Sequence, residues 1–241
     1  MNKRWEILPI DEKKQILLEK NLHISSSLAE ILTRKNLDEN SAKLFLNPTK
    51  IPYHDPFLLK DMEKACQRLL LALKNKEKIC IYGDYDVDGV SSTALLMTVF
   101  TKLGFNIDYY LPDRHSEGYG LHIESLQKLI PKYDLLITVD CGITALDEVD
   151  YAKDKIDMII TDHHLPREIL PDAFAIINPT QTQCNYPNKN LCGVGVAFKL
   201  CQGLYQSLNK DIHELENYLD IVALGTIADI VPLVDENRRI V

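Results

Sequence analysis

The sequence of 241 residues contains no apolar run that approaches the ~20 residues of a membrane-spanning helix. Its first residues, Met-Asn-Lys-Arg-Trp-Glu, are charged, and the apolar segment of a secretory signal peptide does not follow them. These two absences predict a cytoplasmic protein without a membrane partner. The length is sufficient for one large domain or two small ones with a full hydrophobic core.

Cysteine pairs spaced for zinc or redox chemistry are also missing, because none of the six cysteines belongs to a Cys-x-x-Cys motif. Most of them lie in apolar segments. This favours reduced thiols in the protein core over disulfides or a zinc site. The cysteines are Cys66, Cys80, Cys141, Cys184, Cys192 and Cys201.

Positive charge is not in excess, since 27 Lys and Arg residues stand against 35 Asp and Glu residues, which gives a net charge of -8. This balance argues against nucleic-acid binding through a general basic coat. A nucleic-acid substrate stays open, because bound metal ions would neutralise many of the acids. A local basic groove can also coexist with an acidic total.

The chain is organised around an acidic turn between a predicted strand and a predicted helix. The run from Lys78 to Tyr82 has the length and composition of a buried parallel strand, and a helical pattern then extends from Gly89 to about residue 103. Ligands of open α/β sheets bind at the carboxyl ends of strands, where this turn would lie. Closely spaced carboxylates repel one another unless a cation lies among them. The turn therefore predicts a divalent-metal site at Asp84, Asp86 and Asp88.

Two other interpretations of the turn compete with this one. Asp-x-Asp-x-Asp-Gly also opens an EF-hand calcium loop, but that loop needs a preceding helix and a glutamate at its twelfth position. Counted from Asp84, the twelfth position is Leu95, and a predicted strand precedes the turn. A solvated acidic turn without function stays open on this stretch alone.

The pattern of a strand followed by an acid occurs twice more. Residues 134–140 form an apolar run that ends at Asp140, and residues 157–161 form another that is followed by Asp162, His163 and His164. A helix is expected between them, and a further strand over residues 173–178. Strands that alternate with helices predict an α/β fold with a doubly wound, mainly parallel sheet flanked by helices. All three acidic strand ends then lie on one edge of the sheet.

Shorter patterns predict the remaining segments. Residues 1–50 have the pattern of short helices, and residues 60–75 form an amphipathic helix whose apolar stripe belongs to the core. The loop after a strand at 105–111 contains Arg114 and His115, which suits a phosphate-contacting loop and a plain surface loop equally. Gly193-Val-Gly195 opens a helix and could let a phosphate approach, although close helix packing is favoured. Asp229 stands in an apolar stretch and needs a partner, which a local cap or a metal would supply.

Four segments in this order resemble the motifs of the DHH phosphoesterase superfamily. They are Gly83-Asp-Tyr-Asp-Val-Asp-Gly89, Thr138-Val-Asp-Cys-Gly142, Thr161-Asp-His-His164 and Ile227-Ala-Asp-Ile-Val-Pro-Leu233. The closer likeness is to the RecJ family, the single-strand-specific 5′→3′ DNA exonucleases of bacteria. Other RecJ-like segments are residues 54–61, Arg114 with Gly118-Tyr-Gly120, and residues 193–196. The likeness covers nearly the whole chain.

The resemblance implies two Mn²⁺ or Mg²⁺ ions, which carboxylate and imidazole ligands suit. It implies that His164 donates to the phosphate, that Arg114 holds a neighbouring phosphate, and that Asp140 completes the catalytic set. Tyr85, Tyr119 and His115 are candidate walls of a groove for stacked bases, with core or surface roles as the competing interpretation. One implied metal position consists of Asp88, Asp140, His163 and Asp229, and the other of Asp86, the bridging Asp140 and Asp84.

By the same resemblance, the reaction is hydrolysis of single-stranded DNA to 5′-mononucleotides in DNA repair and recombination. Single-strand-binding protein and a helicase are the implied protein partners. The expected division is a helical segment over residues 1–50 and a DHH catalytic domain over residues 51–241. The DHHA1 domain of RecJ proteins, with its Gly-Gly-His motif, and their nucleic-acid-binding domain have no counterpart before Val241.

Two other functions stay open. Related DHH proteins cleave short oligoribonucleotides, cyclic dinucleotides or pyrophosphate, but their first motif usually carries a histidine, and Gly83 to Gly89 contains none. Some RecJ-like proteins have lost metal ligands and serve as non-catalytic replication scaffolds. In this sequence every motif carboxylate and both histidines are present, which favours an enzyme.

Overall fold

A computed structural model describes residue 6 and residues 9–241 of the chain. The chain divides into two compact units, Met1–Pro52 and Tyr53–Val241. Separate clusters of buried apolar side chains form the cores of the two units. Among the described residues, no helix is both long enough and apolar enough to cross a membrane.

The described residues of the first unit form the helices α1 (Glu12–Leu22), α2 (Ser26–Arg34) and α3 (Glu39–Leu46), followed by the 3₁₀ turn η1 (Pro48–Lys50). A polar side chain precedes each helix and accepts a hydrogen bond from a backbone N–H of its first turn, which satisfies one of the open donors there. These caps are Asp11, Ser25 and Asp38. The predicted helical N-terminal segment is therefore confirmed.

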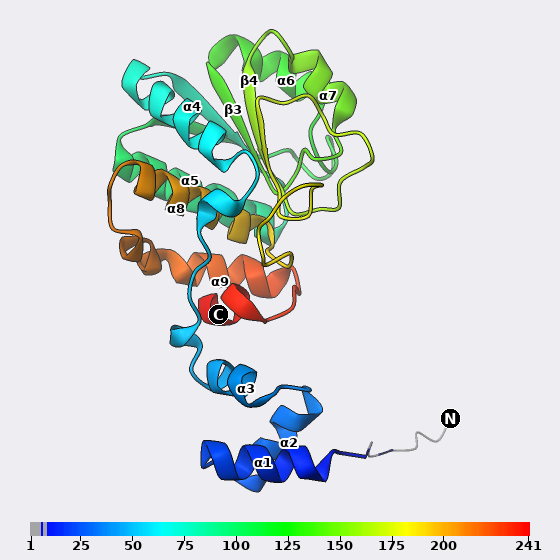
Figure 1. Cartoon of the computed structure of the whole chain (residues 1–241). Coiled ribbons are helices and arrows are strands. Elements are labelled where there is room, and N and C mark those ends of the chain that lie inside the picture. The colour runs from blue at the N-terminus through cyan, green and yellow to red at the C-terminus, as the bar shows by residue number, and fades with distance from the viewer. Residues whose placement is uncertain (1–5, 7–8) are drawn as a thin grey trace. The chain divides into compact units, whose positions relative to one another are not determined.

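The second unit is built on a sheet of five parallel strands in the order β2-β1-β3-β4-β5 (Figure 1). The strands are β1 (Lys78–Tyr82), β2 (Asn106–Tyr110), β3 (Leu135–Val139), β4 (Asp157–Thr161) and β5 (Ala175–Ile177). In the ladder, Tyr82 pairs with both Tyr110 and Thr138, and Val139 pairs with Thr161. The carboxyl ends of these strands consequently meet at one edge of the sheet, as expected from the sequence.

Helices cover both faces of the sheet, which confirms the predicted α/β class. The side chains of successive strand residues point to opposite faces of the sheet, and both faces are apolar. In β1, Ile79 and Ile81 belong to one core and Cys80 and Tyr82 to the other. The first core includes side chains of α4 (Met62–Asn75), α5 (Val87–Leu103) and α8 (Gly193–Ser207). The second includes side chains of α6 (Ile123–Leu129) and α7 (Leu146–Ala152).

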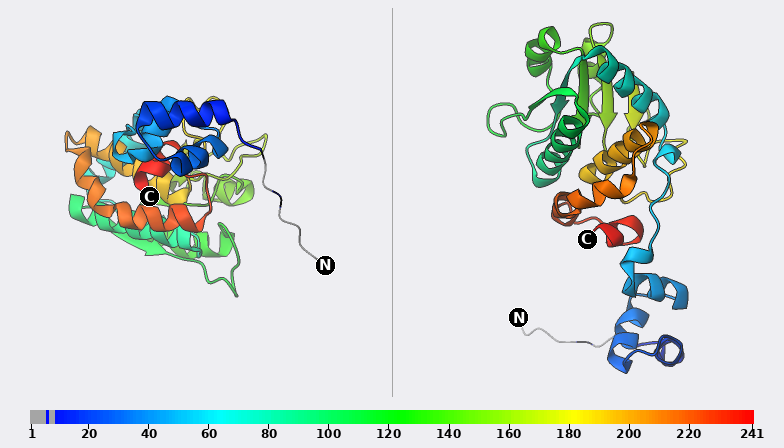
Figure 2. Two further views of the ribbon diagram at one scale, coloured as in Figure 1. Left: turned by 90° about the horizontal axis from the view of Figure 1, so that it is seen from below. Right: turned by 90° about the vertical axis from the view of Figure 1, so that its left-hand side faces the viewer.

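The remaining helices lie on the α5 and α8 side of the sheet (Figure 2). They are α9 (Leu219–Ala228) and α10 (Asp235–Ile240), which follow the 3₁₀ helix η4 (Ile212–Tyr218). The short turns η2 (Pro56–Leu58) and η3 (Ile130–Lys132) complete the unit. All six cysteines are free and buried, in agreement with the prediction of reduced core thiols.

Candidate metal centre

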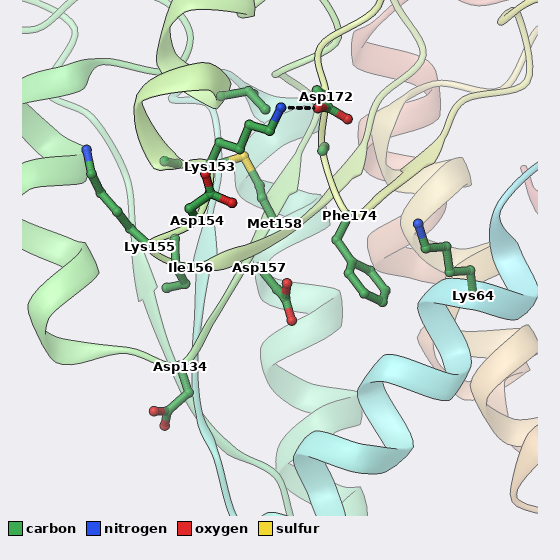
Figure 3. Close-up of a pocket in the computed structure, with 13 residues that line it drawn as sticks. Lys64, Asp134, Lys153, Asp154, Lys155, Ile156, Asp157, Met158, Asp172 and Phe174 are labelled. Atoms are coloured by element: carbon green, nitrogen blue, oxygen red, sulfur yellow. Dashed lines mark ion pairs between the residues drawn. The ribbon is translucent and has the colours of Figure 1, made fainter.

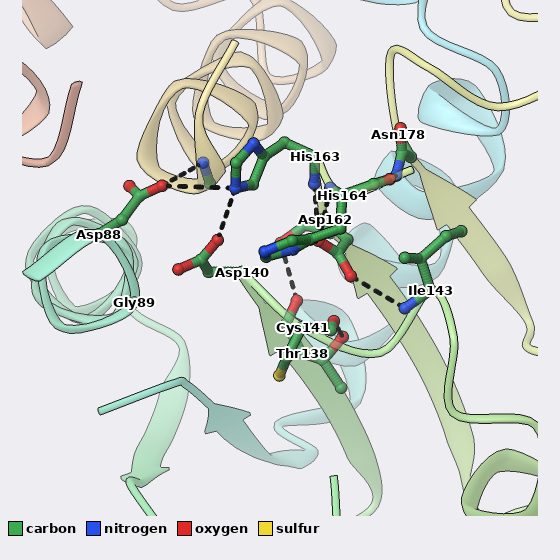
Figure 4. Close-up of polar contacts among 12 residues, drawn as sticks. Asp88, Gly89, Thr138, Asp140, Cys141, Ile143, Asp162, His163, His164 and Asn178 are labelled. Atoms are coloured by element: carbon green, nitrogen blue, oxygen red, sulfur yellow. Dashed lines mark hydrogen bonds and ion pairs between the residues drawn. The ribbon is translucent and has the colours of Figure 1, made fainter. Parts of the chain in front are cut away.

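The edge formed by the strand ends gathers most of the predicted site residues. Figure 4 shows Asp88, Asp140, His163 and His164 among them. Three groups of Asp and His side chains occur there among the described residues, and the ligand atoms of each group lie within 4.8 Å of one another. The groups share members, so they form one cluster. They consist of Asp140, His163 and His164; of Asp88, His163 and Asp229; and of Asp84, Asp86 and Asp140.

The turn after β1 places two carboxylates differently. Asp84 is 1% exposed, its Oδ1 has no hydrogen-bond partner, and burial raises the pKa of this carboxyl above its ordinary value. Asp86 is exposed and caps α5, because its Oδ1 accepts a hydrogen bond from Gly89 N at 2.9 Å. A side chain at Gly89 would begin 2.6 Å from the carbonyl oxygen of Asp84, so the turn requires glycine at this position.

The carboxylate of Asp88 lies at the N-terminus of α8. Its oxygens accept hydrogen bonds from Gly193 N at 2.6 Å and from Val194 N at 2.8 Å, where the helix dipole also favours negative charge. The phosphate-approach interpretation of the Gly193 segment is therefore wrong, since a protein carboxylate already uses these N–H groups. Close packing is the correct interpretation, because a Cβ at Gly193 would lie 2.5 Å from Asp140 Oδ1.

Asp140 follows β3 in the left-handed backbone conformation, with φ of 61°, and is 2% exposed. Its Oδ1 accepts no hydrogen bond and lies 3.1 Å from His163 Nε2. Burial, followed by the nearby charges of Asp88 and Asp86, raises the pKa of Asp140 far above its ordinary value. This carboxylate is thus held in an environment that suits a cation.

His163 lies between three carboxylates. Besides Asp140, its ring nitrogens are 3.9 Å from Asp88 Oδ2 and 3.7 Å from Asp229 Oδ2. Asp229 ends α9, and burial raises the pKa of its carboxyl. The next residue, Ile230, has φ of 59°, a conformation that is strained for a β-branched side chain. The apolar stretch around Asp229 therefore supplies a carboxylate to the cluster.

Asp162 contacts His163 and His164 of the cluster, and the sequence predicts no separate role for it. It is 1% exposed and accepts backbone hydrogen bonds from Ile143 at 2.9 Å, His163 at 2.7 Å and His164 at 3.1 Å. Its Oδ1 also contacts His164 Nδ1 at 2.7 Å. This hydrogen bond is the main cause that raises the pKa of His164 to about 9. The sequence feature that could have indicated this role is the position of Asp162 directly before the two histidines.

Arg114 does not belong to any of the three groups of ligand atoms. It is exposed, and its guanidinium lies 5.3 Å from the centre of the Tyr85 ring. On the same loop, the Tyr119 hydroxyl lies 3.3 Å from His164 Nε2, and the two rings meet edge to face. His115 is exposed. The loop therefore brings one aromatic ring to the cluster.

The donor set fits divalent cations. Its atoms are carboxylate oxygens and imidazole nitrogens without any thiolate, a combination that suits Mn²⁺ and Mg²⁺ better than soft metals. The buried oxygens Asp84 Oδ1 and Asp140 Oδ1 have no hydrogen-bond partner. A bound cation would coordinate both of them.

A pocket of about 560 Å³ opens at the opposite edge, beside the amino end of β4 (Figure 3). Lysines and aspartates line it together, and Lys153 pairs with Asp172 at 2.6 Å. Asp157, at the start of β4, pairs with Arg68 at 2.6 Å. The pocket has no contact with the Asp and His cluster and offers no comparable set of metal-ligating atoms.

A comparison with known protein families finds a match over the second unit. Residues 78–226 match the model described as "DHH family, N-terminal domain". The chain belongs to the DHH family. The matched range contains the acidic turn, Asp140 and the Asp162-His163-His164 triplet that gives this family its name.

Curated relatives of this DHH chain include the single-stranded-DNA-specific exonuclease RecJ of Bacillus subtilis, which is 45% identical over 240 residues. That alignment covers 98% of this chain and 30% of the relative. The chain spans about a third of the length of the curated relatives it matches.

Two solved structures of RecJ from Thermus thermophilus have the same fold. The complex with Mn²⁺ has a TM-score of 0.81 and 28% identity, covering 98% of this chain and 34% of that chain. The complex with Mg²⁺ has a TM-score of 0.68 and 25% identity, covering 98% and 30%.

Proposed function

We propose that this DHH chain forms the catalytic part of a metal-dependent 5′→3′ exonuclease that hydrolyses single-stranded DNA to 5′-mononucleotides. The observation that carries the proposal is the convergence of three groups of Asp and His ligand atoms, each within 4.8 Å, at one edge of the sheet. The similarity to the RecJ exonuclease of Bacillus subtilis supports this choice of substrate, because it extends over 98% of this chain.

In this proposal the cluster would bind two Mn²⁺ or Mg²⁺ ions. Asp88, His163 and Asp229 would hold one ion, and Asp84, Asp86 and Asp140 would hold the other. Asp140 Oδ1 lies 3.1 Å from His163 Nε2, so Asp140 could contribute to the first position as well. When bound, such ions supply positive charge and Lewis acidity to a phosphodiester. The metal-bound structures of RecJ from Thermus thermophilus support both metals as candidates.

His164 and Arg114 are the proposed phosphate-binding side chains. Asp162 contacts Nδ1 of His164 at 2.7 Å, and this contact raises the pKa of the imidazole and favours its protonated form. A positioned cationic donor stabilises negative charge on a phosphate oxygen. The exposed guanidinium of Arg114 provides a fork of donors for a neighbouring phosphate, and Tyr85 and Tyr119 provide rings against which bases can stack.

The wider setting follows from this substrate. An exonuclease for single strands acts in DNA repair and recombination, where single-strand-binding protein covers its substrate and a helicase produces it. DNA as the substrate also favours a cytoplasmic location. The proposed catalytic domain covers residues 51–241, and residues 1–50 are a helical addition to it.

The test is release of mononucleotides from a 5′-phosphorylated single-stranded oligonucleotide, with Mn²⁺ and with EDTA. Metal-dependent release from the 5′ end supports the proposal. Release from duplex DNA at the same rate, or release in EDTA, would contradict it.

A second substrate set separates the alternatives. Faster cleavage of dinucleotides or cyclic dinucleotides than of long strands would assign the chain to the DHH phosphodiesterases of short substrates. A chain that neither binds Mn²⁺ nor cleaves any of these substrates would have the properties of a replication scaffold.

A further inference from the structure

A single buried amide group connects two segments that lead to the metal centre. Asn237, on α10, is 1% exposed. Its Nδ2 donates hydrogen bonds to the carbonyl oxygens of Asn190 at 2.6 Å and Pro232 at 3.0 Å. An amide nitrogen has two protons, so these two bonds use its full donor capacity.

Each of these carbonyls is close in sequence to a group of the cluster. Pro232 follows Asp229 by three residues, and Asn190 precedes Gly193 by three residues. Gly193 N is one of the two donors that hold the carboxylate of Asp88. Asp88 and Asp229 in turn share one group of candidate ligand atoms with His163. The amide of Asn237 therefore connects the segment that carries Asp229 to the segment whose backbone N–H at Gly193 holds Asp88.

The neighbouring residue anchors the helix that carries Asn237. Glu236 is 1% exposed, and its Oε1 accepts hydrogen bonds from Lys199 Nζ at 2.9 Å and from His54 N at 3.0 Å. Its Oε2 accepts a hydrogen bond from the Tyr186 hydroxyl. Lys199 belongs to α8, so α10 is fixed to the same helix whose N-terminus holds Asp88. A buried ion pair of this kind is better suited to specifying one arrangement than to adding stability.

We propose that Asn237 is a positioning residue of the metal centre, which sets the separation between the Asp229 segment and the N-terminus of α8. Its effect on hydrolysis rests on the proposed function, whereas the positioning itself is a property of the metal-free chain. Loss of an outer partner of metal-ligating groups typically weakens metal affinity about 10–100-fold. The metal position of Asp88, His163 and Asp229 is expected to show this loss.

The experiment compares the full chain with the variants Asn237→Ala and Asn237→Leu by calorimetric titration with Mn²⁺. Asn237→Leu approximately retains the size of the side chain and removes the two amide protons without adding a charge, so it separates the loss of donors from the loss of packing. Both variants are expected to bind one Mn²⁺ about 10–100-fold more weakly than the wild type.

The control variant is Leu69→Ala, which removes a buried core side chain from α4, a helix without any candidate ligand. It is expected to lower Tm and to leave the Mn²⁺ affinities unchanged. Equal losses of affinity in the control and in the Asn237 variants would show a general effect of destabilisation and would overturn the proposal.

Amide hydrogen exchange in EDTA gives a readout that needs neither metal nor substrate. The Asn237 variants are expected to exchange faster over residues 190–194 and 229–232, while β1 retains its protection and Leu69→Ala lacks this local pattern. Unchanged exchange in these segments, or unchanged Mn²⁺ affinity beside altered exchange, would overturn the proposal. If the wild type binds no Mn²⁺, the proposed function fails and exchange alone decides the positioning.

Discussion

At the scale of single residues, the centre contains two carboxylates with an oxygen that accepts no hydrogen bond. Asp84 and Asp140 are both almost fully buried, and each has an Oδ1 without a hydrogen-bond partner. A buried polar atom without a partner costs roughly 1–3 kcal/mol. The fold therefore accepts a loss of stability at these positions, which is a pattern typical of functional sites.

Asp140→Asn is the residue-scale test of this interpretation. The amide cannot ionise, so the variant loses the ionisation that burial of Asp140 disfavours. The amide can also donate to the neighbouring carboxylates, and Asn tolerates the left-handed conformation of this position. In EDTA we expect the variant to have a higher Tm than the wild type. Added Mn²⁺ should no longer raise the Tm, and hydrolysis should fall at least about 100-fold. Thermal melts and mononucleotide release measure these effects. Retained activity would refute the two-metal assignment.

Asp162→Asn tests the residue that sequence reasoning left without a role. The variant loses the charged partner of His164 Nδ1, so the pKa of His164 should fall from about 9 toward 6.5, its ordinary value. A misplaced proton donor typically costs about 10²–10⁴-fold in rate, and here the loss is expected in kcat more than in KM. NMR titration of His164 in the metal-free protein checks the cause. An unchanged pKa would mean that Asp162 acts only on the backbone.

The sequence predicts residue types at the site better than their partners. Asp88 was expected as a ligand because of its spacing in the turn, and its position at the cluster agrees with that expectation. Its hydrogen bonds to Gly193 and Val194 join residues more than a hundred positions apart. No local pattern contains such a contact, because it depends on how α8 packs against α5.

At the scale of elements, the N-terminus of α8 packs closely against the carboxylate of Asp140. Gly193→Ala would place a Cβ 2.5 Å from Asp140 Oδ1, whereas Gly195→Ala would meet the Leu191 side chain at 3.3 Å and Cys192 Sγ at 3.7 Å. We expect Gly193→Ala to weaken Mn²⁺ binding at least about tenfold and Gly195→Ala to change it little. Alanine stabilises a helix relative to glycine by up to about 1 kcal/mol, so Tm should not fall in the control. Equal Mn²⁺ affinities in both variants would contradict the packing described here.

The carboxylate of Glu117 connects the loop that carries Arg114 and Tyr119 to the neighbouring elements. Glu117 accepts hydrogen bonds from Tyr110 OH, from Asp113 N at 2.9 Å and from Ser125 Oγ at 3.0 Å. The bond from Tyr110 is the main cause that lowers the pKa of Glu117 below 4.5.

A lowered pKa in the folded state stabilises the fold above the unfolded-state value and loses that contribution as pH falls through the folded-state value. The stability difference between the wild type and Glu117→Gln should therefore be full above about pH 4.5 and shrink below it. Urea unfolding of both proteins at a series of pH values measures this difference. A difference that stays constant down to pH 2 would exclude the ionised form as its cause.

Elements with a strong apolar period were predictable, because burial alone dictates their pattern. The expected strand from Lys78 to Tyr82 has the same bounds as β1, and four of the stripe residues of α4 are buried. Irregular segments were not predictable in the same way. The loop around Glu117 is held by hydrogen bonds to that side chain from β2, from α6 and from the loop backbone, which leave no periodic signal.

At the scale of the whole molecule, strand order explains the place of the site. β2 lies on one side of β1 and β3 on the other, so the chain crosses the sheet in both directions from β1. Open α/β sheets bind ligands at this kind of switch point. The alternation of strands and helices predicted the parallel sheet, and the sequence motifs placed the acids at its edge.

Removal of residues 1–52 is the test at this scale. The second unit has its own core and contains all the candidate ligands, so residues 53–241 are expected to fold and to bind Mn²⁺ with the affinities of the full chain. Circular dichroism and calorimetric titration measure both properties. Loss of Mn²⁺ binding in a folded fragment would show that the first unit contributes to the centre.

The hydrogen bonds that hold Asp88 and Asp162 have a consequence for mutational tolerance. Their donors are mostly main-chain N–H groups, at Gly193, Val194 and Ile143 as well as in the triplet itself. A main-chain donor persists whatever side chain the residue carries, and only proline removes it. Val194 and Ile143 can therefore be replaced by residues of similar volume without disturbing the carboxylates. Proline at position 194 would remove a hydrogen bond to Asp88, and proline at position 143 would remove one to Asp162.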